Sequence, residues 1–262
     1  MVITLTTDFG LTDYFVGAMK GVILRINPNA TLVDITHDIA PQNIEQGAFL
    51  FANAARYFPA DAIHVVVVDP GVGSARRAIA LQAGETIFVA PDNGVLSLAI
   101  RNSQFAIRCA HLNNPAYWLP RVSHTFHGRD VFAPVAAHLS LGVPLEALGD
   151  PIDDWVRLPR ASALRAGDAI AGRVVHIDRF GNIVTNIGEE MLSGMDRGRL
   201  VVHIGGRVVR GVKSTYADAA RGELVALISS SWHLEVAMRD GNAAEAVGVR
   251  IGDEMVVGLD RE

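Results

Sequence analysis

The sequence predicts an α/β protein of two domains: an N-terminal α/β domain with a mainly parallel central sheet, and a smaller C-terminal all-β domain with a barrel-like sheet. Strand-like apolar runs alternate with helical patterns in the first part of the chain, and short β-rich runs punctuated by Gly or Asn fill the last part. We expect the domains to span residues 1–160 and 168–262, because the composition changes near Pro151–Gly172.

The spacing of apolar residues predicts the elements of the N-terminal domain. A helix is expected over Tyr14–Ile26, with Thr12 or Asp13 as its N-cap. Asn43 is suited to cap a second helix, with Gln46 at the capping-box position. The remaining expected elements are strands over Val2–Thr7, Thr31–Ile35, Ala62–Val68, Ala78–Gln82 and Thr86–Ala90, and a helix over Val131–Leu139.

The run Ala62–Val68 is the main indication of a parallel sheet. It is continuously apolar and rich in β-branched residues, which is typical of a strand covered on both faces. Beyond the domain boundary, the expected strands are shorter and follow turn residues closely. They are Gly172–Ile177, Leu200–Ile204, Leu224–Ile228 and Glu254–Val257.

Composition excludes several functional classes. Half of the 262 residues are hydrophobic, so a substantial core can form, and the net charge of −5 with scattered basic residues argues against a nucleic-acid partner. No apolar run reaches the roughly 20 residues that span a bilayer, and the N-terminus is read as a strand, so a cytoplasmic protein without a membrane partner is expected. The single cysteine, Cys109, predicts a buried small hydrophobe.

The most informative segment begins where the apolar run ends at Asp69. Turn glycines follow, and then Arg76 and Arg77. An acid in this position can simply bond the backbone of its own turn, but a nearby arginine would stabilise its charged form and favours a functional ion pair. His127 lies in a second polar cluster that continues with Gly128, and histidine can take or orient a water proton near neutral pH.

Acids also follow the first two predicted strands. Asp8 follows the first strand, where α/β sheets often contact a ribose or an amino group, although no dinucleotide-binding or P-loop motif is present. Asp34 and His37 follow the second strand. Together with Asp8 and Asp69 these residues could in principle bind a metal, but their spacing matches no strong metal motif.

Two segments of the C-terminal domain are candidates for ligand binding. In the first, Asp178 to Asn186, the simplest interpretation is a hairpin turn, although Phe180 and Asn182 also suit stacking and edge-on hydrogen bonding to a purine. The second runs from Ser229 to Glu235. It fits an ordinary strand with a serine-rich start, or hydroxyls and an acid that hold an amino-acid head group.

An ordered set of motifs spans nearly the whole chain. It resembles the S-adenosyl-L-methionine (SAM) hydroxide adenosyltransferases, hydrolytic relatives of the fluorinase and chlorinase enzymes. The motifs are Thr7-Asp-Phe-Gly10, Val16-Gly-x-x-Lys20-Gly21, Val33-Asp-Ile-Thr-His37, Val68-Asp-Pro-Gly-Val-Gly73, Pro91-Asp-Asn-Gly94, Thr125-Phe-His-Gly-Arg-Asp130 and Phe180-Gly-Asn182-x-x-Thr-Asn186. The resemblance implies an N-terminal α/β domain, a C-terminal barrel, and a homotrimer with active sites between neighbouring subunits. It also implies that SAM is the substrate and that no cofactor or metal is used.

The resemblance also implies roles for individual residues. The catalytic set falls on Asp69, Arg76 and His127, where the halogenases carry a tyrosine in place of Asp69 and a serine near Gly128. Asp8 matches an acid that holds the ribose hydroxyls. The other residues implied in substrate binding are Asp178, Phe180, Asn182, Ser230, Glu235 and Met238. Ser231 replaces a halogenase arginine, and Gln42 a fluorinase tryptophan.

The expected reaction is attack of water on the ribose C5′ carbon of SAM, which releases methionine as a neutral thioether. We expect His127 and Asp69 to orient and deprotonate the water, with Arg76 paired to Asp69. Three alternatives stay open: a halide-using adenosyltransferase, a metal-dependent hydrolase, and a non-catalytic adenosine or SAM sensor.

Overall fold

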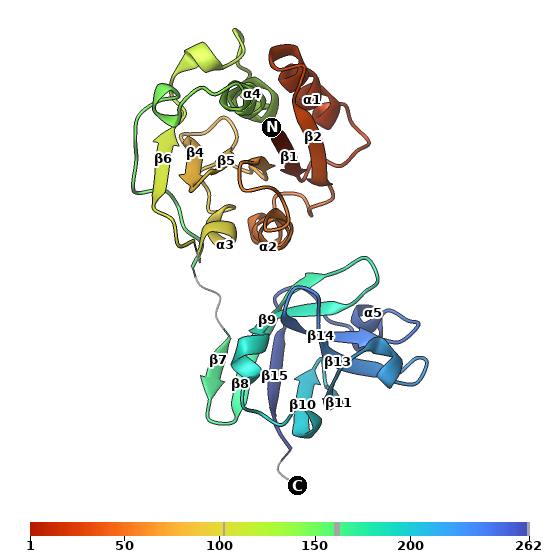
Figure 1. Ribbon diagram of the computed structural model, residues 1–262. Coiled ribbons are helices and arrows are strands. Elements are labelled where there is room, and N and C mark those ends of the chain that lie inside the picture. The colour runs from red at the N-terminus through yellow and green to blue at the C-terminus, as the bar shows by residue number, and fades with distance from the viewer. Residues whose placement is uncertain (102, 160–162, 261–262) are drawn as a thin grey trace. The chain divides into compact units, whose positions relative to one another are not determined.

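The computed structural model describes residues 1–101, 103–159 and 163–260. The chain divides into two compact units, Met1–Leu158 and Pro159–Glu262 (Figure 1). Each unit has its own hydrophobic core.

A six-stranded sheet forms the centre of the first unit, in the order β2-β1-β3-β5-β4-β6. β1 pairs in parallel with β2 and β3, and β3 with β5, whereas β4 runs antiparallel to both β5 and β6. The sheet is therefore mainly parallel, with an antiparallel strand near one edge. The strands are β1 (Val2–Thr7), β2 (Thr31–Thr36), β3 (Ile63–Val67), β4 (Ala78–Ala83), β5 (Thr86–Pro91) and β6 (Ile107–His111).

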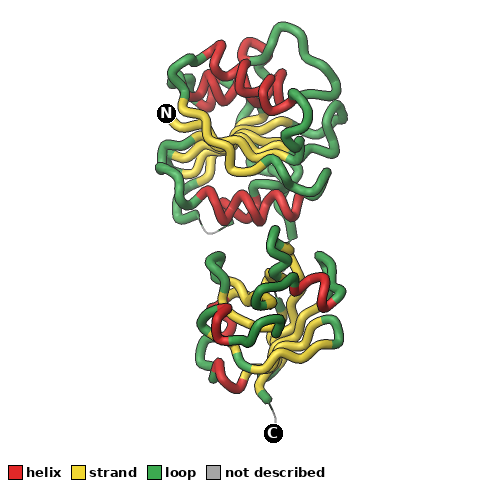
Figure 2. Tube along the Cα trace, turned by 90° about the vertical axis from the view of Figure 1, so that its right-hand side faces the viewer, coloured by secondary structure: helices red, strands yellow, loops and turns green. Residues whose placement is uncertain are grey.

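Helices cover both faces of this sheet (Figure 2). One face packs against α1 (Phe15–Ile26) and α4 (Ala133–Ser140), and the other against α2 (Ile44–Ala55) and the short α3 (Ser97–Ile100). Successive residues of a strand point to opposite faces, and all five residues of β3 are buried. This confirms that the apolar run around β3 is a central strand covered on both sides.

The sequence predicted the N-cap of α2 correctly but not that of α1. The N-cap of α1 is Tyr14, without a side-chain capping bond, so the assignment to Thr12 or Asp13 was wrong. The N-cap of α2 is Asn43, whose side chain accepts the N–H of Gln46 at 2.9 Å, as expected. An apolar pattern gives the helical face reliably, but the cap depends on how the preceding loop enters the helix.

The connections in the first unit bring two strand ends together. The chain leaves β1 through α1 on one face, enters β2, and returns through α2 on the other face to β3, which lies on the opposite side of β1. Thr7 of β1 is in register with Val67 of β3. The carboxyl ends of β1 and β3 are therefore neighbours at a topological switch point, where α/β sheets commonly form a crevice.

The second unit is a barrel-like β structure with strand order β11-β10-β15-β8-β9-β14-β13-β12, and β7 pairs with β8. Only Gly211, with φ +72°, separates β11 from β12, so consecutive residues join the two ends of the strand order. The strands are β7 (Leu164–Ala166), β8 (Ala169–Ile177), β9 (Ile183–Gly188), β10 (Leu200–Ile204), β11 (Arg207–Arg210), β12 (Val212–Lys213), β13 (Leu224–Ile228), β14 (His233–Met238) and β15 (Glu254–Leu259).

Short helical segments complete the two units. A helix, α5 (Ala243–Val247), follows β14, and a π-helical turn, η2 (Gly128–Phe132), leads into α4. The 3₁₀ turns span Pro115–Tyr117, Leu145–Ala147, Glu189–Leu192, Arg197–Arg199 and Tyr216–Asp218.

Among the residues described, no helix is both long enough and apolar enough to cross a membrane. Cys109 is buried in β6, as predicted.

Candidate functional site

Arg76 connects an acid and an imidazole at the edge of the first sheet. Its Nε donates to both carboxylate oxygens of Asp69, at 2.9 and 3.1 Å, and its Nη2 lies 2.5 Å from Oδ2. The same Nη2 lies 2.8 Å from Nδ1 of His127. The side chains of Asp69 and Arg76 are only 5% and 11% exposed, so this group is largely shielded from solvent.

The loop between β3 and β4 positions the acid and the cation. Asp69 follows the buried end of β3, and Arg76 stands two residues before β4. Between them, Gly73 adopts φ +76°, and a Cβ atom there would lie 2.2 Å from the carbonyl oxygen of His124. Only glycine allows this close approach, which brings the loop against the segment that carries His127.

His127 is placed by an irregular helix start. It caps η2, and Pro134 lies in the first turn of α4, where its missing N–H is tolerated. Asp130 within η2 is fully buried and accepts from both the backbone N–H and the hydroxyl of Ser123, each at 2.8 Å. The helix predicted over Val131–Leu139 therefore begins earlier, in a π-helical turn of the kind often found at functional sites.

The contact with Arg76 fixes the tautomer of His127. A guanidinium group can only donate hydrogen bonds, so Nδ1 of His127 must accept, and the ring proton of the neutral imidazole lies on Nε2. Burial lowers the pKa of His127, and the positive charge of Arg76 lowers it further. A neutral ring that presents an N–H from Nε2 is thus the form that this site stabilises.

A small cavity of about 110 Å³ lies beside the acid and the imidazole. Three aromatic rings, Phe9, Phe15 and Phe126, form an apolar wall with edge-to-face contacts at centroid distances of 5.1 to 5.8 Å. A water molecule occupies about 30 Å³ of liquid, so the cavity can hold one or a few waters. Its lining comprises Phe9, Phe15, Val67, Asp69, Val72, Thr125, Phe126, His127 and Gly128.

Asp8 follows the end of the neighbouring strand β1. Its Oδ2 accepts the backbone N–H of Gln42 at 2.7 Å. Burial raises the pKa of Asp8, and the charge of Asp69 raises it further, in spite of the hydrogen bond from Gln42. The first unit thus gathers Asp8, Asp69, Arg76 and His127 at adjacent strand ends.

The acids that suggested a metal site are engaged in other contacts. Asp34 pairs with Lys20 at 2.5 Å and lies 3.1 Å from the ring of His37, while Asp69 is held by Arg76. Within the described parts of the chain, no group of three or more His, Cys, Asp or Glu side chains has an arrangement that could hold a metal ion.

Three of the residues predicted to bind substrate lie in one turn of the second unit, between β8 and β9. The carboxylate of Asp178 accepts from the backbone N–H groups of Phe180 and Asn182 and from the Asn182 side chain, each at 2.9 Å. These bonds match the hairpin interpretation of Asp178. The Phe180 ring is 74% exposed, so a flat ligand can reach it.

The other predicted residues lie on β14 or just before it, and β14 pairs with β9. Ser230 lies between β13 and β14, and the antiparallel pairing of β9 with β14 places it at the opposite end of this strand pair from Phe180. Glu235, in β14, is 3% exposed and accepts from the hydroxyl of Tyr216 at 2.9 Å. Burial is the main cause that raises the pKa of Glu235. Met238 ends the strand.

Tyr216 was not identified from the sequence. Burial and the hydrogen bond to Glu235 raise the pKa of its phenol to about 12. The available signal was a capping box at Thr215 and Asp218, which marks the start of the 3₁₀ turn that carries Tyr216.

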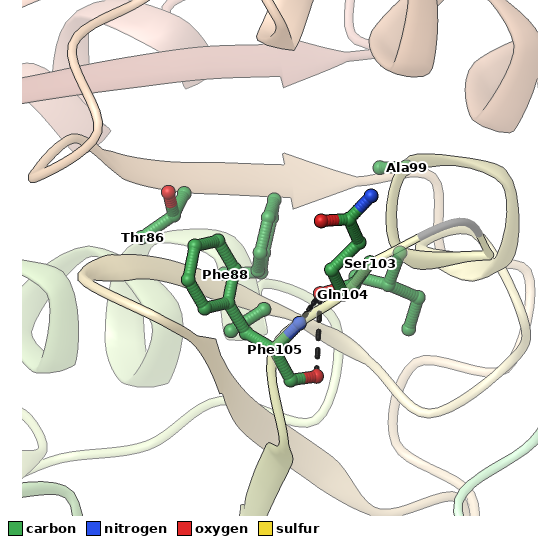
Figure 3. Close-up of a pocket in the computed structure, with 8 residues that line it drawn as sticks. Thr86, Phe88, Ala99, Ser103, Gln104 and Phe105 are labelled. Carbon is green, nitrogen blue, oxygen red and sulfur yellow. Dashed lines mark hydrogen bonds between the residues drawn. The ribbon is translucent and has the colours of Figure 1, made fainter.

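A larger hollow of about 400 Å³ lies elsewhere in the first unit (Figure 3). It opens near Thr86, at the amino end of β5, whereas Asp69 follows the carboxyl end of the parallel strand β3. Its lining includes no acid, base or cation, and consists of Ala83, Thr86, Phe88, Ala99, Ile100, Ser103, Gln104 and Phe105. Size alone therefore does not make it the better candidate for a reaction site.

Comparison with known families gives one consistent result. Residues 3–149 match the SAM hydroxide adenosyltransferase N-terminal domain, and residues 172–256 match the C-terminal domain of the same family. The two matches together include Asp69, Arg76 and His127 as well as Phe180 and Glu235.

Curated relatives align over almost the full chain. An (R)-S-adenosyl-L-methionine hydrolase from Salinispora arenicola is 41% identical over 97% of both chains, and one from Thermus thermophilus is 39% identical over 94% of this chain and 95% of its own. A fluorinase from Nocardia brasiliensis is 28% identical over 96% of this chain and 94% of its own.

Two solved structures share the fold. An uncharacterized conserved protein from Thermotoga maritima superimposes with a TM-score of 0.91 and 37% identity, over 98% of this chain and 100% of that one. A conserved hypothetical protein from Thermus thermophilus gives 0.79 and 38% identity, over 98% and 99% of the two chains.

Proposed function

Because this chain belongs to the SAM hydroxide adenosyltransferase family, we propose that it is an enzyme that hydrolyses SAM to adenosine and L-methionine. The observation that carries the proposal is the contact of one guanidinium, Arg76, with both a carboxylate and a neutral imidazole beside a small cavity that can hold water. The curated hydrolases, 34–41% identical over nearly the whole chain, support the same reaction.

The enzyme does not need to protonate the leaving group in this reaction. The water oxygen forms a bond to C5′ of the ribose while the C5′–S bond breaks, and its electron pair returns to sulfur, which leaves as the neutral thioether of methionine. The attacking oxygen then carries an extra proton and becomes a strong acid. Alignment of water, carbon and sulfur in a closed site can supply about 7–11 kcal/mol of the barrier reduction.

The three polar residues Asp69, Arg76 and His127 have different roles in the attack of the water. The Nε2–H of His127 donates to the water oxygen and directs a lone pair toward carbon, since Nδ1 is occupied by Arg76. Asp69, which lines the cavity, accepts the proton that the oxygen releases after attack. Arg76 orients both partners. This assignment refines the expectation that His127 and Asp69 together orient and deprotonate the water.

The predicted substrate contacts complete the proposal. Asp8 binds the ribose hydroxyls beside the cavity, and its proximity to Asp69 supports a sugar carbon near the water. Phe180 stacks on the adenine, which its high exposure supports. Asn182 holds the purine or ribose, Asp178 binds the methionine head group, and Glu235 and Met238 contribute along β14. Ser230 lies at the opposite end of the β9–β14 strand pair from Asp178, so its role at the same head group stays a prediction from the family resemblance.

We propose that the active enzyme is a cytoplasmic homotrimer with active sites shared by neighbouring subunits, as the family resemblance implies, and that it acts without a cofactor, a metal, a nucleic acid or a membrane. Light scattering tests the trimer. Mixing an inactive Asp69→Asn protein with an inactive Phe180→Ala protein, after dissociation and reassembly, should restore activity if sites are shared.

The decisive test is product analysis over several hours. Incubation with SAM should yield adenosine and methionine in equal amounts, with oxygen from labelled water in the 5′ hydroxyl of adenosine. Asp69→Asn and His127→Gln should lower kcat far more than they raise KM. Equal losses in kcat and affinity would assign these residues to binding, and methylthioadenosine as the main product would refute the reaction.

The alternatives give different results in the same assay. A halide-using enzyme would form a 5′-halo nucleoside in chloride or fluoride, but the acidic side chain of Asp69 on the cavity wall disfavours a bound halide ion. A metal-dependent hydrolase would lose activity with a chelator. A sensor would bind SAM and release no product.

A further inference from the structure

We propose that His37 is a positioning residue for the active site, because it fixes the loop Asp8–Gly10 that follows β1. The inference rests on the proposed SAM hydrolysis, and concerns the motif that first suggested a metal site. Asp8 in this loop is the proposed ribose ligand, and Phe9 forms part of the cavity wall. An error in the position of this loop would displace both the sugar and the wall that confines the water.

Both the backbone and the ring of His37 engage this loop. Its carbonyl oxygen accepts the N–H of Gly10 at 2.8 Å. Its Nδ1 lies 2.8 Å from the hydroxyl of Thr7, and that hydroxyl also accepts the N–H of Phe9 at 3.2 Å. The loop is thus attached to the end of β2 at two successive residues, Phe9 and Gly10.

The carboxylate of Asp34 determines the direction of these hydrogen bonds. It lies 3.1 Å from Nε2 of His37 and can only accept, so a neutral ring carries its proton on Nε2. Nδ1 is then the acceptor for the proton of the Thr7 hydroxyl, whose oxygen also accepts the Phe9 N–H. Nε2 has no well-aligned hydrogen-bond acceptor, so its contact with Asp34 is a charge–dipole attraction rather than a regular hydrogen bond.

Asp34 is itself fixed from the helix side. Its second oxygen pairs with Lys20 of α1 at 2.5 Å. Burial tends to raise the pKa of Asp34, but the hydrogen bond from Lys20 and the attraction of the His37 ring outweigh it, so the pKa lies below its ordinary value. A carboxylate that remains ionised holds the imidazole N–H in the orientation that leaves Nδ1 free for Thr7.

The sequence of contacts from Asp34 through His37 to Thr7 has the order of a catalytic triad, but burial excludes nucleophilic catalysis by the hydroxyl. Thr7 is 0% exposed and His37 is 4% exposed. A substrate carbon cannot reach the Thr7 oxygen, because Thr7 is fully buried and its hydroxyl accepts the Phe9 N–H. Positioning is therefore the role that this geometry supports.

The chain contains a matched control on the same strand. Thr4 of β1 contacts Nδ1 of buried His64 at 2.7 Å, the same pair of groups, but in the core and without a bond to the loop. Thr7→Val and Thr4→Val each remove one buried hydroxyl and keep the shape of the side chain. We expect Thr7→Val to lower kcat/KM for SAM at least about tenfold, and Thr4→Val to leave it within about twofold at a temperature where both remain folded.

A second pair of variants separates positioning from instability. His37→Asn retains an acceptor near Nδ1, because its amide oxygen can take the Thr7 proton, whereas His37→Leu retains none. Activity partly restored in His37→Asn relative to His37→Leu, at matched folded fractions, supports the proposal. Equal activity of the two, or equal kcat/KM in Thr7→Val and Thr4→Val, would overturn it.

Amide hydrogen exchange tests the inference without any substrate. Thr7→Val should accelerate exchange at Phe9 and Gly10 relative to Thr4→Val, while amides in β3 keep their protection. Unchanged exchange at both loop amides would refute the positioning role even in an active enzyme. Conversely, absence of adenosine formation by the unmodified protein would refute the proposed function, and this exchange result would still stand.

Discussion

Acid should destabilise the first unit through a histidine that takes no part in the proposed chemistry. His64, in the central strand β3, is 1% exposed. Its ring stacks on Phe88 at 5.4 Å and meets Phe51 edge-on at 5.2 Å, while Thr4 occupies Nδ1. Burial lowers the pKa of His64 from 6.5 to about 4, because the core cannot solvate an imidazolium.

The size of the effect follows from this pKa. At about 1.36 kcal/mol per pH unit, the difference between 6.5 and about 4 corresponds to about 3 kcal/mol. Between these two values the unfolded chain binds the proton and the native protein does not, so the free energy of unfolding falls as pH decreases. The contribution of His64 is complete above pH 6.5 and is lost progressively toward pH 4.

Urea unfolding of the wild type and of His64→Leu measures this contribution. The variant should be less stable near neutral pH, since the Thr4 hydroxyl loses its partner. Its further loss of stability between about pH 7.5 and pH 5 should be smaller than that of the wild type by about 2 kcal/mol. Other titrating groups are common to both proteins. Parallel stability curves over this range would refute the argument.

Four shorter predictions concern the site and its surroundings. Arg76→Lys should lower kcat by roughly 10- to 100-fold, because a single ammonium group cannot reproduce the several hydrogen bonds of the planar guanidinium group. Unchanged kcat in steady-state assays would contradict this. The midpoint of the acid limb of the kcat profile should lie below pH 6.5, since the pKa of His127 is lowered and an imidazolium would repel the guanidinium; a midpoint at or above pH 6.5 would argue against a depressed pKa. Gly73→Ala should destabilise by about 1–3 kcal/mol in urea, because its Cβ would meet the His124 carbonyl; equal stability would show that the loop rearranges. Cys109, whose pKa burial raises to about 12, should react with iodoacetamide only after unfolding, and rapid native-state labelling would disprove its burial.

The architecture of the first unit was largely predictable, because the buried faces of strands and helices require apolar residues at regular spacing. Apolar runs predicted the strand Val2–Thr7 and the core strand β3, because a strand that is covered on one or both faces needs apolar side chains on those faces. The antiparallel pairing of β4 with β5 was predictable as well, because the two residues between these strands are too few for the crossover that parallel strands need. The edge strand β6 was missed, since its first residues, Ile107 and Arg108, are exposed and give no apolar pattern.

The site was predictable in part. An acid at the end of β3 could be inferred from the residues alone, whereas its grouping with His127 came from the family resemblance. Arg76 and His127 are 51 residues apart, and no spacing rule connects them. They meet because a glycine loop approaches a π-helical turn, and both features depend on tertiary contacts. The tautomer of His127 likewise required the position of the Arg76 nitrogen.

The shared nitrogen of Arg76 has a consequence for how this site can vary. One Nη2 atom serves two acceptors, so the carboxylate and the imidazole form a single thermodynamic unit rather than two independent contributors. Loss of either acceptor frees the guanidinium to shift toward the other, and a double-mutant cycle on Asp69 and His127 would then be strongly non-additive. A viable evolutionary replacement at one of these positions would therefore have to be accompanied by a change at the others.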